Sequence, residues 1–230
     1  MVIDLLTDPA TFFERRAEDG GLAIPAVVAL ATAVVGIVDG LLFQGALQSA
    51  FPGGGPGAGA ALGTFLTLGT TLVRTAAVWL GVAGALLLLA RRFGGEGGDF
   101  RTLLALTGWC LVPMLAYGLL GVAVVAVAMG GVPAPSAPDE IGRFVSGVTG
   151  NGFVVVARRL AFAFVLWQGF LWTFAVRGAF DLDLAAALRT AATPVVTVLL
   201  WTAYVQFASL PGFVLRSQLL RPLLSGGGPV

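Results

Sequence analysis

The sequence predicts an all-α protein that crosses a membrane repeatedly, as a bundle of five transmembrane helices with a short N-terminal interfacial helix. Five apolar stretches are the first observation, at about residues 22–43, 62–90, 102–129, 153–176 and 191–215. Each reaches the roughly 20 residues with which a helix covers 30 Å of hydrocarbon. The composition agrees, with 57% hydrophobic residues, 11% charged residues and a mean hydropathy of +0.94. The stretches are continuous and do not alternate, which argues against membrane-spanning strands.

The first 21 residues carry too much charge of both signs to be a cleavable signal peptide. Asp8 and Pro9 predict a helix start, because Asp8 can cap free amides and Pro9 needs no N–H at the first helical position. Phe12 and Phe13 follow among charged residues. We therefore expect residues 1–21 to form a helix on the membrane surface, with a solvated leader as the alternative.

Two connections lie on the side of the membrane opposite the N-terminus. The first, within residues 44–61, contains the Gly- and Pro-rich segment 52–57 and is expected to be a flexible linker. The second, residues 130–152, has apolar residues at helical spacing around Phe144 and Val148. It predicts a short interfacial helix.

Arginine sets the expected orientation, since cytoplasmic loops are enriched in cationic residues. One side of the membrane collects more of the arginines near span ends: Arg15, Arg16, Arg91, Arg92, Arg101, Arg177 and Arg189. The other side has Arg143, Arg158, Arg159, Arg216 and Arg221. We expect a multi-pass protein with a cytoplasmic N-terminus. The use of Arg without any Lys favours a prokaryotic cell membrane.

Several kinds of site are not expected. The chain has no His and one Cys, Cys110 within the third span, so zinc or copper sites of the usual kind and an intramolecular disulfide are not predicted. A net charge of +1 gives no reason to expect nucleic acid. Without a histidine base or a carboxylate pair in a span, we expect neither an enzyme nor a cofactor.

Two ionisable residues fall well inside the apolar stretches, where charge is costly. Asp39 in the first stretch and Arg74 in the second lie at equal depth if each is counted from the stretch end nearest the N-terminal side. We predict an intramembrane ion pair that fixes the two helices, helped by the small-residue seam Gly36-x-x-x-Gly40. The alternative is a polar cavity for a substrate or lipid headgroup, which further polar residues can join: Gln44, Gln48, Arg158, Arg159 and Gln206.

Three short motifs lie in or beside the polar parts of the chain, and each occurs once. The first is Asp8-Pro9 with Phe12-Phe13, and the second is the turn Gly95-x-Gly97-x-x-Phe100, which leads to Gly108-Trp109 and Pro113. The third is Arg177-Gly178 after a Trp-containing fourth span, followed by a polar loop at 181–189. Asp99 can cap the helix that begins near Phe100. Pro113 is expected to kink or begin a helix, or to mark a broken transporter helix.

Their order and spacing against five spans resemble the Yip1 domain family of five-span membrane proteins, including its prokaryotic members. The resemblance covers most of the chain and implies a single membrane domain over residues 1–230. It implies the fold more firmly than an activity. Eukaryotic members reside in early secretory membranes and are associated with lipidated Rab-type GTPases and vesicle transport.

We expect a membrane scaffold or adaptor that contacts a membrane or cytoplasmic protein partner. Its docking face would contain six arginines, which we call the arginine set: Arg15, Arg16, Arg91, Arg92, Arg101 and Arg177. The same residues can instead bind anionic lipid headgroups. The alternative function is a small carrier or lipid-handling protein with a polar site around Asp39 and Arg74. Small-residue helix faces also permit a homo-oligomer in the lipid bilayer.

Overall fold

The computed structural model describes residues 2–48 and 58–224 of the chain, and the side chains within 3–48 and 61–206. The described part consists of helices joined by short loops and contains no β-strand. The segment 52–57, expected to be a flexible linker, lies outside the described residues.

Five helical segments are long and apolar enough to cross a membrane, as the sequence predicts. The first two are α3 (Ala23–Gln48) and α4 (Ala58–Arg92). The third is divided into α5 (Phe100–Trp109) and α6 (Val112–Gly130), and the last two are α8 (Gly152–Ala179) and α9 (Leu184–Leu224). α9 begins earlier than the predicted residue 191, because Asp183 Oδ1 caps it by accepting a hydrogen bond from the Ala186 N–H at 2.7 Å.

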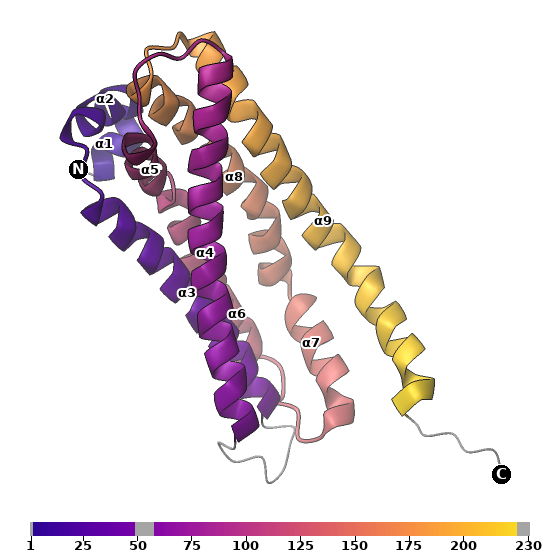
Figure 1. Ribbon diagram of the computed structural model, residues 1–230. Coiled ribbons are helices and arrows are strands. Elements are labelled where there is room, and N and C mark those ends of the chain that lie inside the picture. Colours follow the sequence, from indigo (N-terminus) through magenta and orange to yellow (C-terminus); the bar gives the residue numbers. More distant parts are fainter. Residues whose placement is uncertain (1, 49–57, 225–230) are drawn as a thin grey trace, which may run out of the picture.

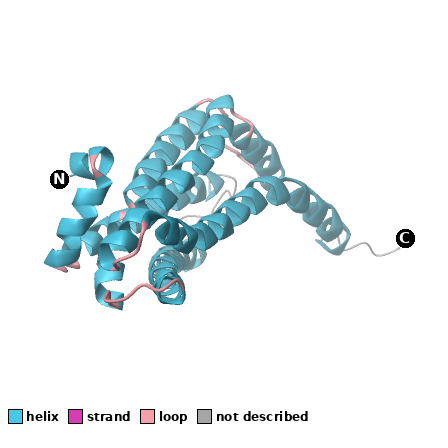
Figure 2. Cartoon of the chain, turned by 90° about the horizontal axis from the view of Figure 1, so that it is seen from above, coloured by secondary structure: helices cyan, strands magenta, loops and turns pink. Residues whose placement is uncertain are grey.

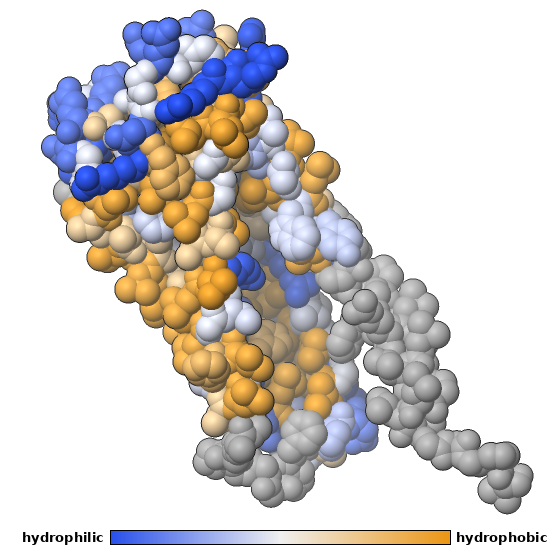
Figure 3. Space-filling model, viewed as in Figure 1, coloured by the Kyte–Doolittle hydropathy of each residue, from blue (hydrophilic) through white to orange (hydrophobic). Residues whose placement is uncertain are grey.

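Shorter helices lie at the two ends of the bundle (Figure 1). α1 (Val2–Thr7) and α2 (Pro9–Asp19) lie at one end with the loops 93–99 and 180–183, and we call this the N-terminal end. The 3-10 turn η1 (Pro138–Glu140) and α7 (Ile141–Thr149) belong to the other, distal end. α9 slants away from the other helices toward the distal end (Figures 1 and 2). Polar residues gather at the N-terminal end and an apolar band covers the middle, as a membrane protein requires (Figure 3).

The third span is interrupted at Pro113, as expected. Cys110 and Leu111 separate α5 from α6, and Pro113 lies in the first turn of α6. Because proline has no N–H, it cannot donate to the carbonyl of Trp109 one turn earlier. The interruption spans two residues that keep right-handed helical angles, so the third span continues across it.

The Gly36-x-x-x-Gly40 seam brings α3 and α4 together, as predicted. A Cβ added to Gly36 would lie 3.3 Å from Thr71 Cγ2, and one added to Gly40 would lie 2.9 Å from Thr67 Cγ2. The absence of a side chain at these two positions lets the helices approach closely. These contacts also fix the antiparallel register of α3 against α4.

The caps predicted for the N-terminal segment are present. Asp8 Oδ1 accepts a hydrogen bond from the Thr11 N–H at 3.2 Å, and Pro9 occupies the first turn of α2. Gly20, with φ 56°, ends the helix in the left-handed conformation that glycine favours. The break at Asp8 divides the predicted single segment into two helices, α1 and α2.

Three apolar side chains of this segment are buried in protein, contrary to the expectation that they face lipid, whereas Ile3 and Leu6 are exposed. Leu5 and Phe13 are fully buried and Phe12 is 5% exposed. They belong to the main core, together with Trp109 of α5 and Val176 of α8. The ends of α5 and α8 thus offer an apolar surface that a local pattern of residues cannot reveal.

A second, smaller core lies at the distal end. The predicted short helix in residues 130–152 is α7, and its Phe144 and Val148 are buried against Ala128 and Val154. Each end of the bundle therefore has its own buried cluster. The polar residues of the middle lie between the two.

Candidate functional site

The loops at the N-terminal end are joined directly to each other. Gly97 pairs with Phe180 in an isolated antiparallel bridge, which connects the loop after α4 to the loop after α8. Gly97 has φ +80°, a backbone angle that side-chain-bearing residues rarely adopt, so the turn depends on glycine here. Phe180 is 2% exposed and is part of the main core. The motif around Gly95 and Gly97 therefore anchors one loop on the other.

The N-terminal helices meet this junction through Gly178. A Cβ placed on Gly178 would lie 3.0 Å from the backbone carbon and oxygen of Phe13. Gly108 has a matching role between spans, since its Cβ would lie 2.6 Å from that of Pro25 at the start of α3. These residues of the sequence motifs allow close packing and are not chemical groups of a site.

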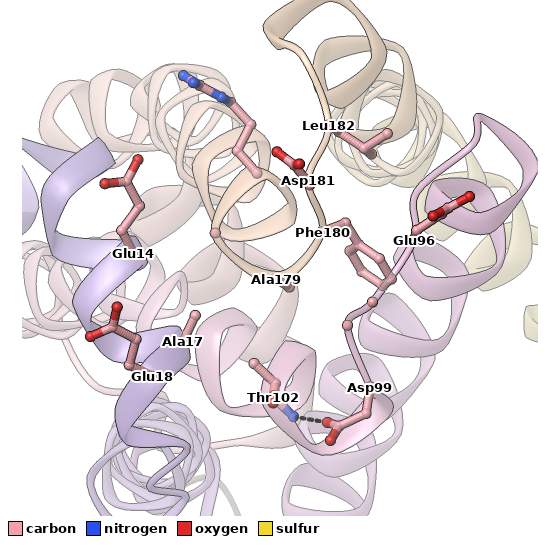
Figure 4. Close-up of a pocket in the computed structure, with 14 residues that line it drawn as sticks. Glu14, Ala17, Glu18, Glu96, Asp99, Thr102, Ala179, Phe180, Asp181 and Leu182 are labelled. Carbon is pink, nitrogen blue, oxygen red and sulfur yellow. Dashed lines mark hydrogen bonds between the residues drawn. The ribbon is translucent and has the colours of Figure 1, made fainter.

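A recess of about 740 Å³ lies between α2, the loop 93–99 and the end of α8. Figure 4 shows Glu14 and Glu18 of α2 across the recess from the two loops. Five carboxylate residues and one arginine line it: Glu14, Glu18, Glu96, Asp99, Asp181 and Arg177. In the described part of the chain, no three acidic, His or Cys residues come close enough to hold a metal ion. The recess is therefore an acidic concave surface suited to a cationic partner.

Asp99 has a defined structural role in this recess. Its Oδ1 accepts a hydrogen bond from the Thr102 N–H at 2.6 Å and caps α5 (Figure 4). The hydrogen bond from the Thr102 backbone holds the pKa of Asp99 below its usual value of 3.8, with a smaller contribution from the Thr102 side chain. The predicted cap is present, and Asp99 remains ionised at neutral pH.

The arginine set is found at the N-terminal end, but its members differ in environment. Five members are exposed on the surface: Arg15, Arg91, Arg92, Arg101 and Arg177. Arg16 is held by the protein, because its Nη1 lies 2.9 Å from Asp19 Oδ2. Its guanidinium also lies 5.7 Å from the Phe12 ring centre and 5.6 Å from that of Trp109. Arg16 thus has a structural role in holding α2 against α5, and it is less accessible to a partner or lipid than the five exposed arginines.

Asp39 and Arg74 do not pair in the structure. Within the described residues a salt bridge joins Arg16 to Asp19, and none joins Asp39 to Arg74. The seam contacts, such as Gly36 against Thr71, place Arg74 level with residue 33 of α3, about 9 Å along the axis from Asp39. The ends of the apolar stretches suggested equal depth because they do not report the helix register. Arg74 is exposed on α4, whereas Asp39 is half-buried.

Asp39 lines a cavity of about 270 Å³ between α3, α6 and α8. Tyr117 of α6 and Arg158 of α8 line the same cavity, which is otherwise mostly apolar. Among the described residues, no hydrogen bond or salt bridge is made by the side chains of Asp39, Tyr117 or Arg158. The structure therefore supplies a polar cavity at the position of Asp39, without Arg74.

The other polar residues considered for this site are separated from one another. Gln206 Nε2 donates a hydrogen bond to the backbone oxygen of Arg158 at 2.7 Å, which ties α9 to α8. Gln44 Nε2 donates to Thr64 Oγ1 at 3.3 Å, between α3 and α4. Arg159 and Gln48 are exposed and do not line the cavity. Tyr117 was not predicted, since a single tyrosine in an apolar run shows no sign of its neighbours.

The comparison with known families agrees with this architecture. The family model of the Yip1 domain matches residues 3–205, which cover nearly all of α1, all of α2, the first four spans, most of the fifth and the loops of the recess. No curated protein and no solved structure matched the chain. The motifs at Asp8-Pro9, Gly95 to Pro113 and Arg177-Gly178 all fall within the matched range. Because the match covers most of the sequence, the chain belongs to the Yip1 domain family, as a membrane protein with five apolar spans.

Proposed function

We propose that the protein is a membrane scaffold or adaptor that binds a partner protein at its N-terminal end. The observation that carries this proposal is the acidic recess of about 740 Å³. Three segments that are distant in sequence build it, and the Gly97–Phe180 bridge and the Phe13–Gly178 contact hold them together. A preformed surface loses little conformational entropy when a partner binds.

The charges suggest which partner the recess accepts. Anionic lipid headgroups attract arginine and repel carboxylates. Exposed arginines such as Arg91, Arg92 and Arg101 suit contact with headgroups, whereas Glu14 and Glu18 of the recess do not. We infer that Arg91, Arg92 and Arg101 anchor the N-terminal end on the lipid surface and that the recess receives a Lys- or Arg-rich segment of the partner.

The same charges support an orientation. The N-terminal end carries the arginines nearest the span ends, and by the positive-inside rule it faces the cytoplasm. The partner is then a cytoplasmic protein or the cytoplasmic part of a membrane protein. We place the chain in a prokaryotic cell membrane, in keeping with its use of Arg without Lys.

A photo-crosslinking amino acid at position 18 tests the adaptor proposal in native membranes. We expect one defined protein adduct at this position and none at position 139, an exposed site at the distal end. The combined variant Glu14→Gln and Asp181→Asn, made with the crosslinking amino acid kept at position 18, should lose the adduct, because it removes two further carboxylates that attract the partner. Arg91→Gln with Arg92→Gln neutralises the same number of charges outside the recess.

The outcomes separate the two roles of the N-terminal end. Loss of the adduct only on neutralising the recess supports docking by its carboxylates. Loss only in the arginine variant would move docking to the arginine set. An adduct that persists in both variants, or the same adducts at positions 18 and 139, would contradict the proposal.

A second candidate function is lipid handling within the membrane, or transport by a small carrier. The cavity that contains Asp39, Tyr117 and Arg158 supports it, because unpaired polar groups are costly in the hydrocarbon region. A carrier needs the same cavity to open to both sides, whereas lipid handling needs only lateral access. The two proposals use opposite parts of the molecule and can hold together.

A further inference from the structure

We propose that the cavity between α3, α6 and α8 binds a single phospholipid, with Arg158 and Asp39 at the level of the phosphate and Tyr117 at the glycerol esters. The inference rests on the second candidate function, lipid handling, and is independent of the adaptor proposal. It names the ligand class and gives each polar residue of the cavity a role.

The cavity is a formed space with oriented walls. Gly121 of α6 lines it, and a Cβ at this position would meet no atom within 4 Å, so the missing side chain leaves the space open. The ring of Tyr117 lies 5.5 Å from that of Phe164, centre to centre, which fixes the phenol beside the cavity. The cavity volume of about 270 Å³ accommodates the phosphoglycerol part of a lipid. It is too small for a drug-sized solute with its own shell of water.

The depths of the polar residues match the order of groups in a phospholipid. α8 has 28 residues and is about 42 Å long, so about 6 Å of it extends beyond each face of a 30 Å hydrocarbon layer. Arg158 lies about 9 Å from the distal start of α8, and therefore about 3 Å inside the layer. The contacts of Gly118 with Val35 and of Tyr117 with Phe164 set the register of α3, α6 and α8, and they place Asp39 near the level of Arg158 and Tyr117 about 8 Å deeper. A lipid has its phosphate at the outer level and its glycerol esters deeper.

The hydrogen-bonding chemistry agrees with that order. Arg158 lines the cavity together with Asp39 but forms no salt bridge with it, so its guanidinium can bind a phosphate, which is the anion present at that depth. Tyr117 can donate its O–H to an ester carbonyl. Asp39 lies near the level of Arg158, and its carboxyl group in the protonated form can donate a hydrogen bond to an oxygen of the lipid, since those oxygens only accept.

The remaining wall is apolar and suits acyl chains. Val35 and Phe43 of α3 and Val124 and Val125 of α6 line the cavity beside the polar groups. A free inorganic phosphate would gain nothing from these residues. The lining therefore favours a phosphate that is attached to a lipid.

Native mass spectrometry of the full chain in detergent tests the proposal with three probes. The probes are dioctanoyl phosphatidic acid, dioctanoylglycerol, which has the same chains without the phosphate, and inorganic phosphate. We expect one bound phosphatidic acid and at least about tenfold weaker binding of dioctanoylglycerol, because a hydrogen bond to a charged group is lost. Inorganic phosphate in excess should not displace the lipid.

Two variants and one matched control assign the binding to this cavity. Arg158→Gln should weaken phosphatidic acid at least about tenfold, whereas Arg159→Gln, at the adjacent exposed arginine, should not. Gly121→Leu leaves every polar group in place and fills the cavity, since a Cβ at Gly121 meets no atom within 4 Å. It should abolish the one-to-one complex even if Arg158→Gln fails to fold.

Each contrary outcome overturns a defined part of the inference. Equal losses in Arg158→Gln and Arg159→Gln would show general attraction to arginine, and binding that survives Gly121→Leu would place the lipid elsewhere. Competition by inorganic phosphate would exclude a lipid-specific site. Equal binding of dioctanoylglycerol would remove the phosphate contact but keep lipid handling, whereas no binding of either lipid would reject lipid handling as well.

Discussion

Gly178 at the end of α8 lies directly against the backbone of Phe13 in α2, so closely that a Cβ on Gly178 would be 3.0 Å from the Phe13 carbonyl. This contact joins the N-terminal helices to the fourth span. The same contact borders the acidic recess, so the shape of the recess depends on it.

Gly178→Ala should destabilise the fold, because the added methyl group meets backbone atoms that cannot rotate away. Overpacking of this kind costs about 1–3 kcal/mol. Thermal unfolding in detergent, followed by tryptophan fluorescence, measures the effect. Gly81→Ala in α4 is the control, since no atom lies within 4 Å of its Cβ position. An unchanged unfolding temperature for Gly178→Ala would show that α2 is not packed as described.

Arg16→Ala should lower the free energy of unfolding by about 1 kcal/mol, because it removes a cation–π contact with Trp109 and Phe12. The emission spectrum of Trp109 should change as well. Arg15→Ala removes an exposed neighbouring charge and should stay within about 0.5 kcal/mol of the parent protein. Equal effects of the two substitutions would contradict the structural role assigned to Arg16.

Cysteine pairs test the register of α3 against α4. In a Cys110→Ala background, Gly36→Cys with Thr71→Cys should form a disulfide on mild oxidation, because a Cβ at position 36 lies 3.3 Å from the Thr71 methyl group. Asp39→Cys with Arg74→Cys should not, since about 9 Å along the axis separates their levels. Gel mobility after cleavage between the two helices reports each bond. A disulfide that forms only in the second pair would contradict this register and support the predicted ion pair between Asp39 and Arg74.

The cap formed by Asp99 should make α5 sensitive to acid. Its pKa is lower in the folded chain than its usual value of 3.8, so the ionised cap stabilises the fold above that value. This contribution is lost as the pH falls through the lower, folded pKa. Unfolding temperatures measured between pH 6 and pH 2 should therefore fall less for Asp99→Asn, which keeps a capping oxygen without titrating. An identical pH profile would exclude this contribution from Asp99.

The proposed orientation predicts which loops a membrane-impermeant maleimide reaches in intact cells. In the Cys110→Ala background, Asp139→Cys at the distal end should react, and Glu96→Cys at the N-terminal end should react only after the membrane is opened. Both positions are exposed in the structure, so access depends on the membrane alone. The reverse pattern would place the N-terminal end outside.

Features set by neighbouring residues were predictable from the sequence, whereas features set by distant ones were not. Continuous apolar runs predicted the five spans, and Asp8, Asp99 and Pro113 marked helix starts, because each acts within one turn of its own position. The level of Arg74 against α3 depends on which residues of two helices touch. No apolar run carries that information.

Burial of Phe12 and Phe13 was missed for the same reason. A charged segment with two phenylalanines has the same local pattern whether it lies on lipid or on protein. The surface that covers them belongs to α5 and α8, far along the chain. Tyr117 likewise became part of a candidate site only when α6 was placed beside Asp39 and Arg158.

The packing of α2 also sets an order of events during synthesis. Phe13 leaves the ribosome early, but Gly178 follows 165 residues later, which at 5–20 residues per second takes about 10 to 30 s. Until then α2 can pack only against Trp109 of α5, and the recess does not exist. A chain released after three spans would therefore leave Phe13 without the α8 surface that covers it, open to chaperones and proteases.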